Sequence, residues 1–151
     1  MKKSNSKKYL KLVLYIMIFF TVTMIVAVVL NFVGLIKEPN LDTTWIVFLV
    51  VMFIVSVLLI RIINDSYDTI FKRRNVDRFN MIGYTFIVMT IIDYITALVT
   101  PGSNGTIITI IPGVFITADM CMSLIPGLLS FVIAESFRDA IDIKEENDLT
   151  I

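Results

Sequence analysis

Four long blocks of apolar residues, separated by short polar segments, dominate the pattern of the chain. They cover about residues 12–36, 45–63, 79–100 and 112–134. A helix needs about 20 mostly apolar residues to cross a bilayer, and each block has about that length. The pattern therefore predicts an all-α fold, an integral membrane four-helix bundle, built as a single membrane domain over residues 1–151.

The first block follows a basic N-terminus, "MKKSNSKKYLK", as the core of a signal peptide would. However, its apolar run continues to Ile36, well beyond the roughly 7–15 residues of a signal-peptide core. No small-x-small cleavage site follows it. We therefore expect an uncleaved first span.

The start of the fourth block has two interpretations, because Pro112 and Gly113 interrupt it. The helix could begin near Ile107 and kink at Pro112. Alternatively, residues 106–111 lie in the outer interface and the helix begins at Pro112. Since proline is well accommodated in the first turn of a helix, the second interpretation is favoured.

Composition agrees with a membrane protein, since 57% of the residues are apolar against about 45–50% in soluble domains. The chain has no histidine, which excludes a histidine-based metal site or catalytic triad. It also lacks a phosphate-binding loop and the HExxH and CxxC motifs. We therefore expect no enzyme, no catalytic or metal site, no cofactor and no direct contact with nucleic acid.

Basic residues are distributed unevenly between the two sides of the predicted spans. Five lysines precede the first span, and the loop 64–78 carries a basic cluster of Lys72, Arg73, Arg74 and Arg78, whereas the opposite side has only Lys37. Because basic residues accumulate on the cytoplasmic side, both termini, the loop and the tail 135–151 are expected in the cytoplasm. Apolar residues at helical spacing over 61–75 further predict a helix along the membrane surface, with the basic cluster near anionic lipid head groups. The alternative is that residues 62–74 dock a cytosolic partner.

Two carboxyl groups lie inside the predicted spans. Asp93 precedes the end of the third span, and Asp119 follows the start of the fourth. An acidic residue at depth costs about 2.5–3.5 kcal/mol on insertion, so it usually faces protein or water. If the two helices pack antiparallel, the carboxyls share a level and could hold a proton or a cation. The alternatives are a wet outer vestibule, or a structural contact with nearby hydroxyls; those hydroxyls are Thr90, Tyr94, Thr96 and Thr117.

The tail differs from the rest of the chain because it is short and acidic. Residues 135–146 favour helix, with Arg138 and Asp142 spaced for an i,i+4 ion pair. The ending "NDLTI" is expected to break this helix and leave an extended apolar end. An acidic helix is repelled by an anionic leaflet, so we expect the tail to project as a peptide ligand for a cytosolic domain. The residues expected to bind the partner are Arg138, Asp139, Asp142, Lys144, Glu145, Glu146, Asn147, Asp148, Leu149, Thr150 and Ile151.

The ending "AIDIKEENDLTI" and the preceding "ESFRDA" resemble the C-terminal signature of a family of small four-helix bacterial membrane proteins of unknown function, the YoaS-like proteins. The layout of four spans and a charged inner loop is similar over the whole chain, although the loop is more basic here at "KRR". Members are often encoded beside an XRE-type helix-turn-helix regulator. The resemblance thus implies a bacterial cell (plasma) membrane location and such a regulator as cytosolic partner.

Three functions follow as hypotheses. The first is a regulatory membrane protein whose tail engages the helix-turn-helix regulator. The second is an immunity protein against a membrane-active bacteriocin, which would need the outer face rather than the tail. The third is a small transporter or channel subunit that uses Asp93 and Asp119. The lipid bilayer is the other expected partner, and the sequence leaves a homo-oligomer open.

Overall fold

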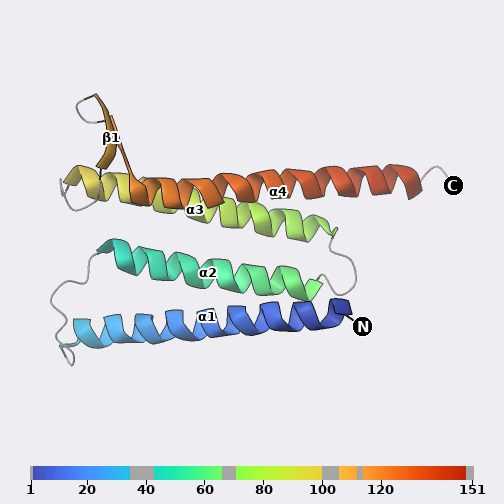
Figure 1. The fold of residues 1–151 in the computed structure, drawn as a ribbon, viewed down its shortest axis with the longest axis horizontal. Coiled ribbons are helices and arrows are strands. Elements are labelled where there is room, and N and C mark those ends of the chain that lie inside the picture. Colours follow the sequence, from blue (N-terminus) through green and yellow to red (C-terminus); the bar gives the residue numbers. More distant parts are fainter. Residues whose placement is uncertain (1, 35–42, 66–70, 100–105, 112–113, 149–151) are drawn as a thin grey trace. The chain divides into compact units, whose positions relative to one another are not determined.

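The computed structural model describes residues 2–34, 43–65, 71–99, 106–111 and 114–148. Within these ranges the chain forms four helices and one two-stranded sheet (Figure 1). The elements, in chain order, are α1 (Lys2–Phe32), α2 (Thr43–Asp65), α3 (Arg73–Val99), β1 (Thr106–Ile111), β2 (Val114–Thr117) and α4 (Ala118–Asp148). All four helices are long and apolar enough to cross a membrane, which confirms the predicted all-α, multi-pass membrane fold.

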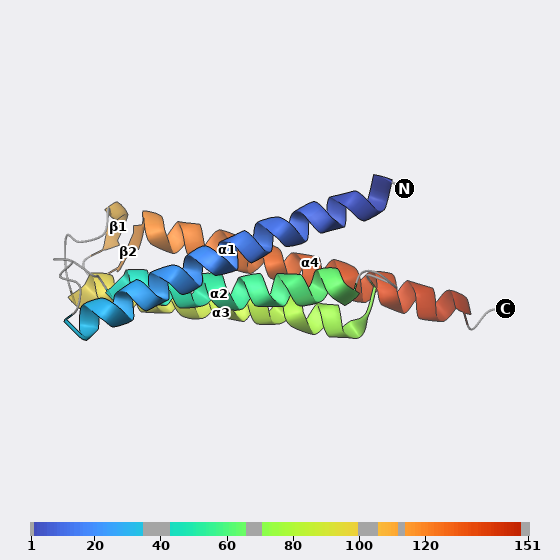
Figure 2. The same cartoon turned by 90° about the horizontal axis from the view of Figure 1, so that it is seen from below.

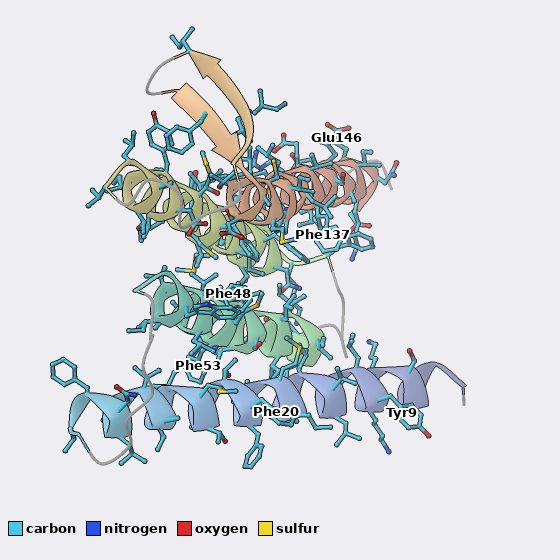
Figure 3. The ribbon with its side chains drawn as sticks, turned by 60° about the vertical axis from the view of Figure 1, so that its left-hand side comes forward. Tyr9, Phe20, Phe48, Phe53, Phe137 and Glu146 are labelled. Carbon is cyan, nitrogen blue, oxygen red and sulfur yellow. The ribbon has the colours of Figure 1, made fainter. Side chains whose placement is uncertain are left out.

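The chain divides into two compact units, residues 1–70 and 71–151. In the first unit α1 and α2 lie side by side and run antiparallel (Figures 1 and 2). Helix α1 ends where Gly34 adopts a positive φ of 81° and its N–H donates to the carbonyl oxygen of Asn31. Glycine takes this conformation without a side-chain clash, so it terminates the helix. Many large apolar side chains along α1 are exposed, as expected of a helix that faces lipid (Figure 3).

In the second unit α3 and α4 also run antiparallel and are in contact along their length. Small residues bring the two helices together. The Phe131 ring of α4 covers Gly83 of α3, and Gly127 of α4 lies against Phe86. Tyr84 adds an edge-to-face contact with Phe131, the ring centroids being 5.1 Å apart. Such contacts between small residues and rings are typical of membrane helix pairs, in which close packing replaces the hydrophobic effect.

The start of the fourth helix differs from both sequence-based interpretations. Residues 106–111 form strand β1, which pairs antiparallel with β2, and α4 begins only at Ala118. The expected start of the fourth span at residue 112, and the earlier start near Ile107, are therefore wrong as helix starts. The sequence "TIITIIPGVFIT" has two β-branched runs on either side of a Pro-Gly pair, which favours a hairpin over a helix. Residues 112–113 lie outside the described part of the chain.

Helix α3 begins at Arg73, inside the segment 64–78 that the sequence assigns to a cytoplasmic loop. Three members of the basic cluster, Arg73, Arg74 and Arg78, therefore lie in its first turns. The predicted helix over residues 61–75 includes residues 66–70, which lie outside the described ranges. At this same end of the unit, α4 extends past the start of α3 (Figure 1). The tail is thus a continuation of a helix and not a separate element.

Candidate functional site

A polar cluster lies in the contact between α3 and α4, formed by Thr90, Asp93 and Ser123. Thr90 and Asp93 are three residues apart on α3 and so point to the same side of the helix. Ser123 of α4 lies 2.8 Å from Thr90, hydroxyl to hydroxyl, and 3.5 Å from Oδ2 of Asp93. Asp93 has 0% of its surface exposed, and Ser123 has 2%. The cluster is therefore a buried group of hard oxygen atoms inside an apolar helix pair.

The second carboxyl, Asp119, lies near the cluster without joining it by a described hydrogen bond. Its negative charge acts on the Asp93 carboxyl. It is only partly buried and lies in the first turn of α4, where a carboxylate complements the positive end of the helix dipole. The antiparallel register therefore brings the two carboxyls close, and Ser123 contacts the deeper one.

Among the hydroxyls proposed as structural partners of the two carboxyls, only Thr90 belongs to the cluster, through Ser123. Thr96 donates to the carbonyl oxygen of Ile92 on its own helix. Tyr94 packs against Phe115 of β2, with ring centroids 5.5 Å apart. Thr117 is buried, and its hydroxyl accepts a hydrogen bond of 3.3 Å from the backbone N–H of Met120, which makes it the N-cap of α4.

Sequence reasoning missed Ser123 as the residue that contacts Asp93. The signal was its spacing, since Ser123 lies four residues after Asp119 and thus one helical turn further along the same face. It also missed the cap at Thr117, which the pattern of an apolar strand followed by Thr-Ala-Asp indicates.

The four residues of the basic cluster differ in exposure and in their contacts. Arg73 and Arg74 are exposed, whereas Arg78 is partly buried and its Nη1 donates to Oδ1 of Asn75 at 3.0 Å. Lys72 precedes the helix, and its carbonyl oxygen accepts from the Asn75 N–H. Arg73, in the first turn of α3, forms salt bridges to two carboxylates of the tail.

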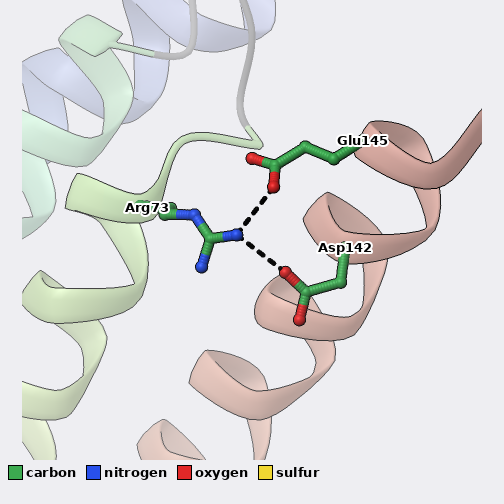
Figure 4. Close-up of polar contacts among 3 residues, drawn as sticks. All are labelled: Arg73, Asp142 and Glu145. Carbon is green, nitrogen blue, oxygen red and sulfur yellow. Dashed lines mark hydrogen bonds and ion pairs between the residues drawn. The ribbon is translucent and has the colours of Figure 1, made fainter. Parts of the chain in front are cut away.

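That contact is the Arg73 clamp, formed by Arg73, Asp142 and Glu145 (Figure 4). Nη2 of Arg73 donates to Oδ1 of Asp142 at 2.9 Å and to Oε2 of Glu145 at 2.7 Å. The two carboxylates lie three residues apart on α4 and present one side of the helix to α3. The expected pair between Arg138 and Asp142 is not formed: Arg138 pairs with Glu135 at 2.6 Å, because Asp142 faces Arg73.

An apolar core lies next to the clamp. Val76, Ala134 and Ile141 are buried together, with Phe79 and Phe137 packed against them. Phe137, labelled in Figure 3, makes edge-to-face contacts with both Phe71 and Phe79 at centroid distances of 5.5 and 5.3 Å. The first part of the tail therefore packs on α3 as far as Ile141, because its apolar stripe meets an aromatic surface there. Beyond it, Asp142 and Glu145 reach Arg73 through their side chains, and the helix continues past the start of α3.

The end of the tail also differs from expectation. Asn147 and Asp148 are helical, so the predicted break after Glu146 is wrong for these two residues. The other expected partner-binding residues, Leu149, Thr150 and Ile151, lie outside the described ranges. Asp139, Ile143, Lys144 and Glu146 are exposed. The described tail is thus a helix with one face on α3 and an opposite face that is exposed.

Comparison with known proteins adds the family. A family model for proteins of unknown function, DUF2975, matches residues 41–151. The chain belongs to the DUF2975 family. The DUF2975 match covers α2, α3, the strands and α4, and so includes both the polar cluster and the Arg73 clamp. The match confirms the expectation that the chain belongs to a family of proteins of unknown function. No curated protein and no solved structure matches the chain.

Proposed function

We propose that this DUF2975 protein is a membrane-bound regulatory protein whose tail helix engages a cytosolic helix-turn-helix regulator of the XRE type, with both termini in the cytoplasm. The resemblance to YoaS-like proteins supports the class of partner. The distribution of basic residues supports the orientation. The observation that carries the proposal is the exposed face of the tail helix.

This face combines charge with one apolar residue. Asp139, Ile143 and Glu146 follow one another at spacings of four and three residues and therefore share one side of α4. Ile143 is 60% exposed and lies between two exposed carboxylates. An apolar residue framed by carboxylates is the composition of a small helical docking face.

The opposite face of the same helix holds it in place. Ala134, Phe137 and Ile141 pack on α3, and the Arg73 clamp flanks them. The docking face is thus ordered before a partner arrives. Binding to such a helix avoids most of the ordering cost that a disordered tail would incur.

The chemistry of the face suits a DNA-binding partner. Helix-turn-helix proteins carry a basic surface that contacts phosphates. An acidic helix complements that surface and would compete with DNA for it. The regulator would then be held at the membrane in a form that cannot bind its operator, and release of the regulator from the tail would restore DNA binding.

The test is recovery of bound proteins from detergent-solubilised native membranes, identified by mass spectrometry. The full-length chain should recover a small helix-turn-helix protein, and a chain ending at Ile141 should not. The double variant D139K/E146K reverses the docking face and should lose the partner as well. The control is D77K, which reverses an exposed carboxylate on α3 and leaves the tail sequence unchanged.

Recovery of the regulator at the full-length level by the truncated chain or by D139K/E146K would sink the proposal. If D77K also loses the regulator, the loss reflects a change of net charge and not the docking face. Because all variants keep the apolar spans, correct insertion can be verified for each by membrane fractionation.

A further inference from the structure

We propose that Thr90, Asp93 and Ser123 form a binding site for one small monovalent cation, for which Na⁺ is the probe. This inference concerns the polar cluster in the α3–α4 contact and is independent of the tail and of any cytosolic partner.

The first observation is an unpartnered oxygen on a buried acid. Asp93 is 0% exposed, and its Oδ1 has no hydrogen-bond partner among the described residues. The other oxygen, Oδ2, has only the long contact of 3.5 Å with Ser123. A buried carboxylate with so little compensation is strongly destabilising unless a positive charge accompanies it.

No side chain of these helices supplies that charge. Residues 79–137 contain no lysine, arginine or histidine at all. Asp119, the other acidic residue near the cluster, supplies no positive charge either. A proton taken up by Asp93 or a cation from outside the helix pair would neutralise the carboxylate, and the oxygen ligands around it lead us to propose the cation.

The hydroxyl groups are arranged to accept such an ion. Thr90 can donate its hydrogen to the carbonyl oxygen of Phe86 at 2.9 Å, and Ser123 can donate to that of Asp119 at 3.1 Å. The two hydroxyl oxygens lie 2.8 Å apart, a hydrogen-bond distance at which either can be the donor, and Ser123 Oγ lies 3.5 Å from Oδ2 of Asp93. A bound cation would replace these hydrogen bonds, with both hydroxyl hydrogens then directed at the backbone carbonyl oxygens.

The donor set also fits the class of ion. Carboxylate and hydroxyl oxygens are hard ligands, which select alkali or alkaline-earth cations over zinc or copper. No group of three or more His, Cys, Asp or Glu side chains in the described residues could hold a metal ion. One buried carboxylate balances a single positive charge, which favours a monovalent cation.

The experiment uses the purified full-length protein in detergent. Binding of ²²Na⁺ gives the affinity, and the unfolding temperature is compared in sodium chloride and in N-methylglucamine chloride at equal ionic strength. At a Na⁺ concentration about ten times Kd, we expect the wild type to unfold roughly 3–5 °C higher than in N-methylglucamine.

Asp93→Asn should abolish both the bound ²²Na⁺ and the shift, and should unfold no lower than the wild type does without Na⁺, because it removes the uncompensated charge. The matched control is Asp77→Asn, which removes an exposed carboxylate from the same helix and should keep the full shift.

Ser123→Ala removes one ligand and should weaken ²²Na⁺ binding about tenfold. Its control is Ser130→Ala, since Ser130 is also buried on α4 but donates only to the carbonyl oxygen of Pro126. The comparison of Ser123→Ala with Ser130→Ala tests the cation site even if Asp93→Asn does not fold.

Two outcomes would overturn the proposal. One is a wild type that binds no ²²Na⁺ and shows no shift with Na⁺, Li⁺ or K⁺, including the case in which acid alone stabilises it and Asp93 holds a proton. The other is ²²Na⁺ binding that Asp93→Asn or Ser123→Ala leaves unchanged.

Discussion

Three polar side chains in the α3–α4 contact show how a membrane helix accommodates a hydroxyl or a carboxyl. Thr117 gives its oxygen to a backbone N–H at the start of α4, and Ser123 contacts a residue on the neighbouring helix. Oδ1 of Asp93 has no hydrogen-bond partner among the residues that the structure describes. A cap and a hydroxyl contact are sufficient structural explanations for the first two residues. No such structural contact accounts for the burial of Asp93, and this residue therefore points to a binding role.

The cap at Thr117 makes the first prediction. Thr117→Val keeps the shape of the side chain and removes the acceptor for the Met120 N–H. We expect a loss of about 1 kcal/mol in the free energy of unfolding, measured by denaturant titration in mixed micelles. Thr96→Val is the control, because the Thr96 hydroxyl only donates to its own helix and its removal should have little effect. Equal losses in the two variants would contradict the assignment of a cap.

At the scale of elements, the antiparallel pair of α3 and α4 is the feature from which both candidate sites derive. One register places Phe131 over Gly83, Thr90 beside Ser123, and Arg73 beside the tail. A change in this register would disturb the polar cluster and the Arg73 clamp together. The packing of small residues is thus the physical link between the two sites.

The contact at Gly83 makes the second prediction. A Cβ atom on Gly83 would come within 2.7 Å of the Phe131 ring, so the ring must move. Gly83→Ala should lower the free energy of unfolding by about 1–2 kcal/mol, although alanine favours helix over glycine by up to about 1 kcal/mol. Combination with Phe131→Leu should recover part of the loss in a double-mutant cycle. Strict additivity of the two changes would show that the residues do not touch.

The Arg73 clamp makes the third prediction. Arg73→Ala removes both ion pairs to the tail and should accelerate amide hydrogen exchange over residues 142–148 roughly two- to fivefold, because exposed ion pairs contribute modestly. High salt should reduce the difference between this variant and the wild type. Arg74→Ala, an exposed neighbour, is the control and should leave exchange unchanged. Faster exchange in both variants would point to a general effect of charge instead of the clamp.

At the scale of the whole molecule, the orientation in the membrane remains a prediction from the basic residues. A fluorescent protein fused after Ile151 should fluoresce, and alkaline phosphatase at the same position should be inactive, because the tail is expected in the cytoplasm. Replacing Lys72, Arg73, Arg74 and Arg78 together by glutamine should lower the fraction of molecules in this orientation. An active phosphatase fusion on the unmodified chain would reverse the proposed topology and remove the tail from cytosolic partners.

The sequence by itself determined the class of this protein. A block of about 20 apolar residues has the length of a spanning helix. In a bilayer its backbone N–H and C=O groups have no water to bond, and a helix pairs them within the segment. The four helices and the acidic helix after the last span follow from this local rule. The start of α4 did not follow, because hydropathy alone does not distinguish a β-branched apolar hairpin over 106–117 from the first turns of a helix.

The tertiary structure decided which polar residues meet. Ser123, and not a threonine, contacts Asp93, and Asp142 faces Arg73, sixty-nine residues away in the chain, rather than Arg138. These choices depend on the rotation and register of one helix against another, which in the α3–α4 pair are set by Gly83, Gly127 and the rings that cover them. Helical spacing shows which residues share a face, but only the packing of two helices determines what that face contacts.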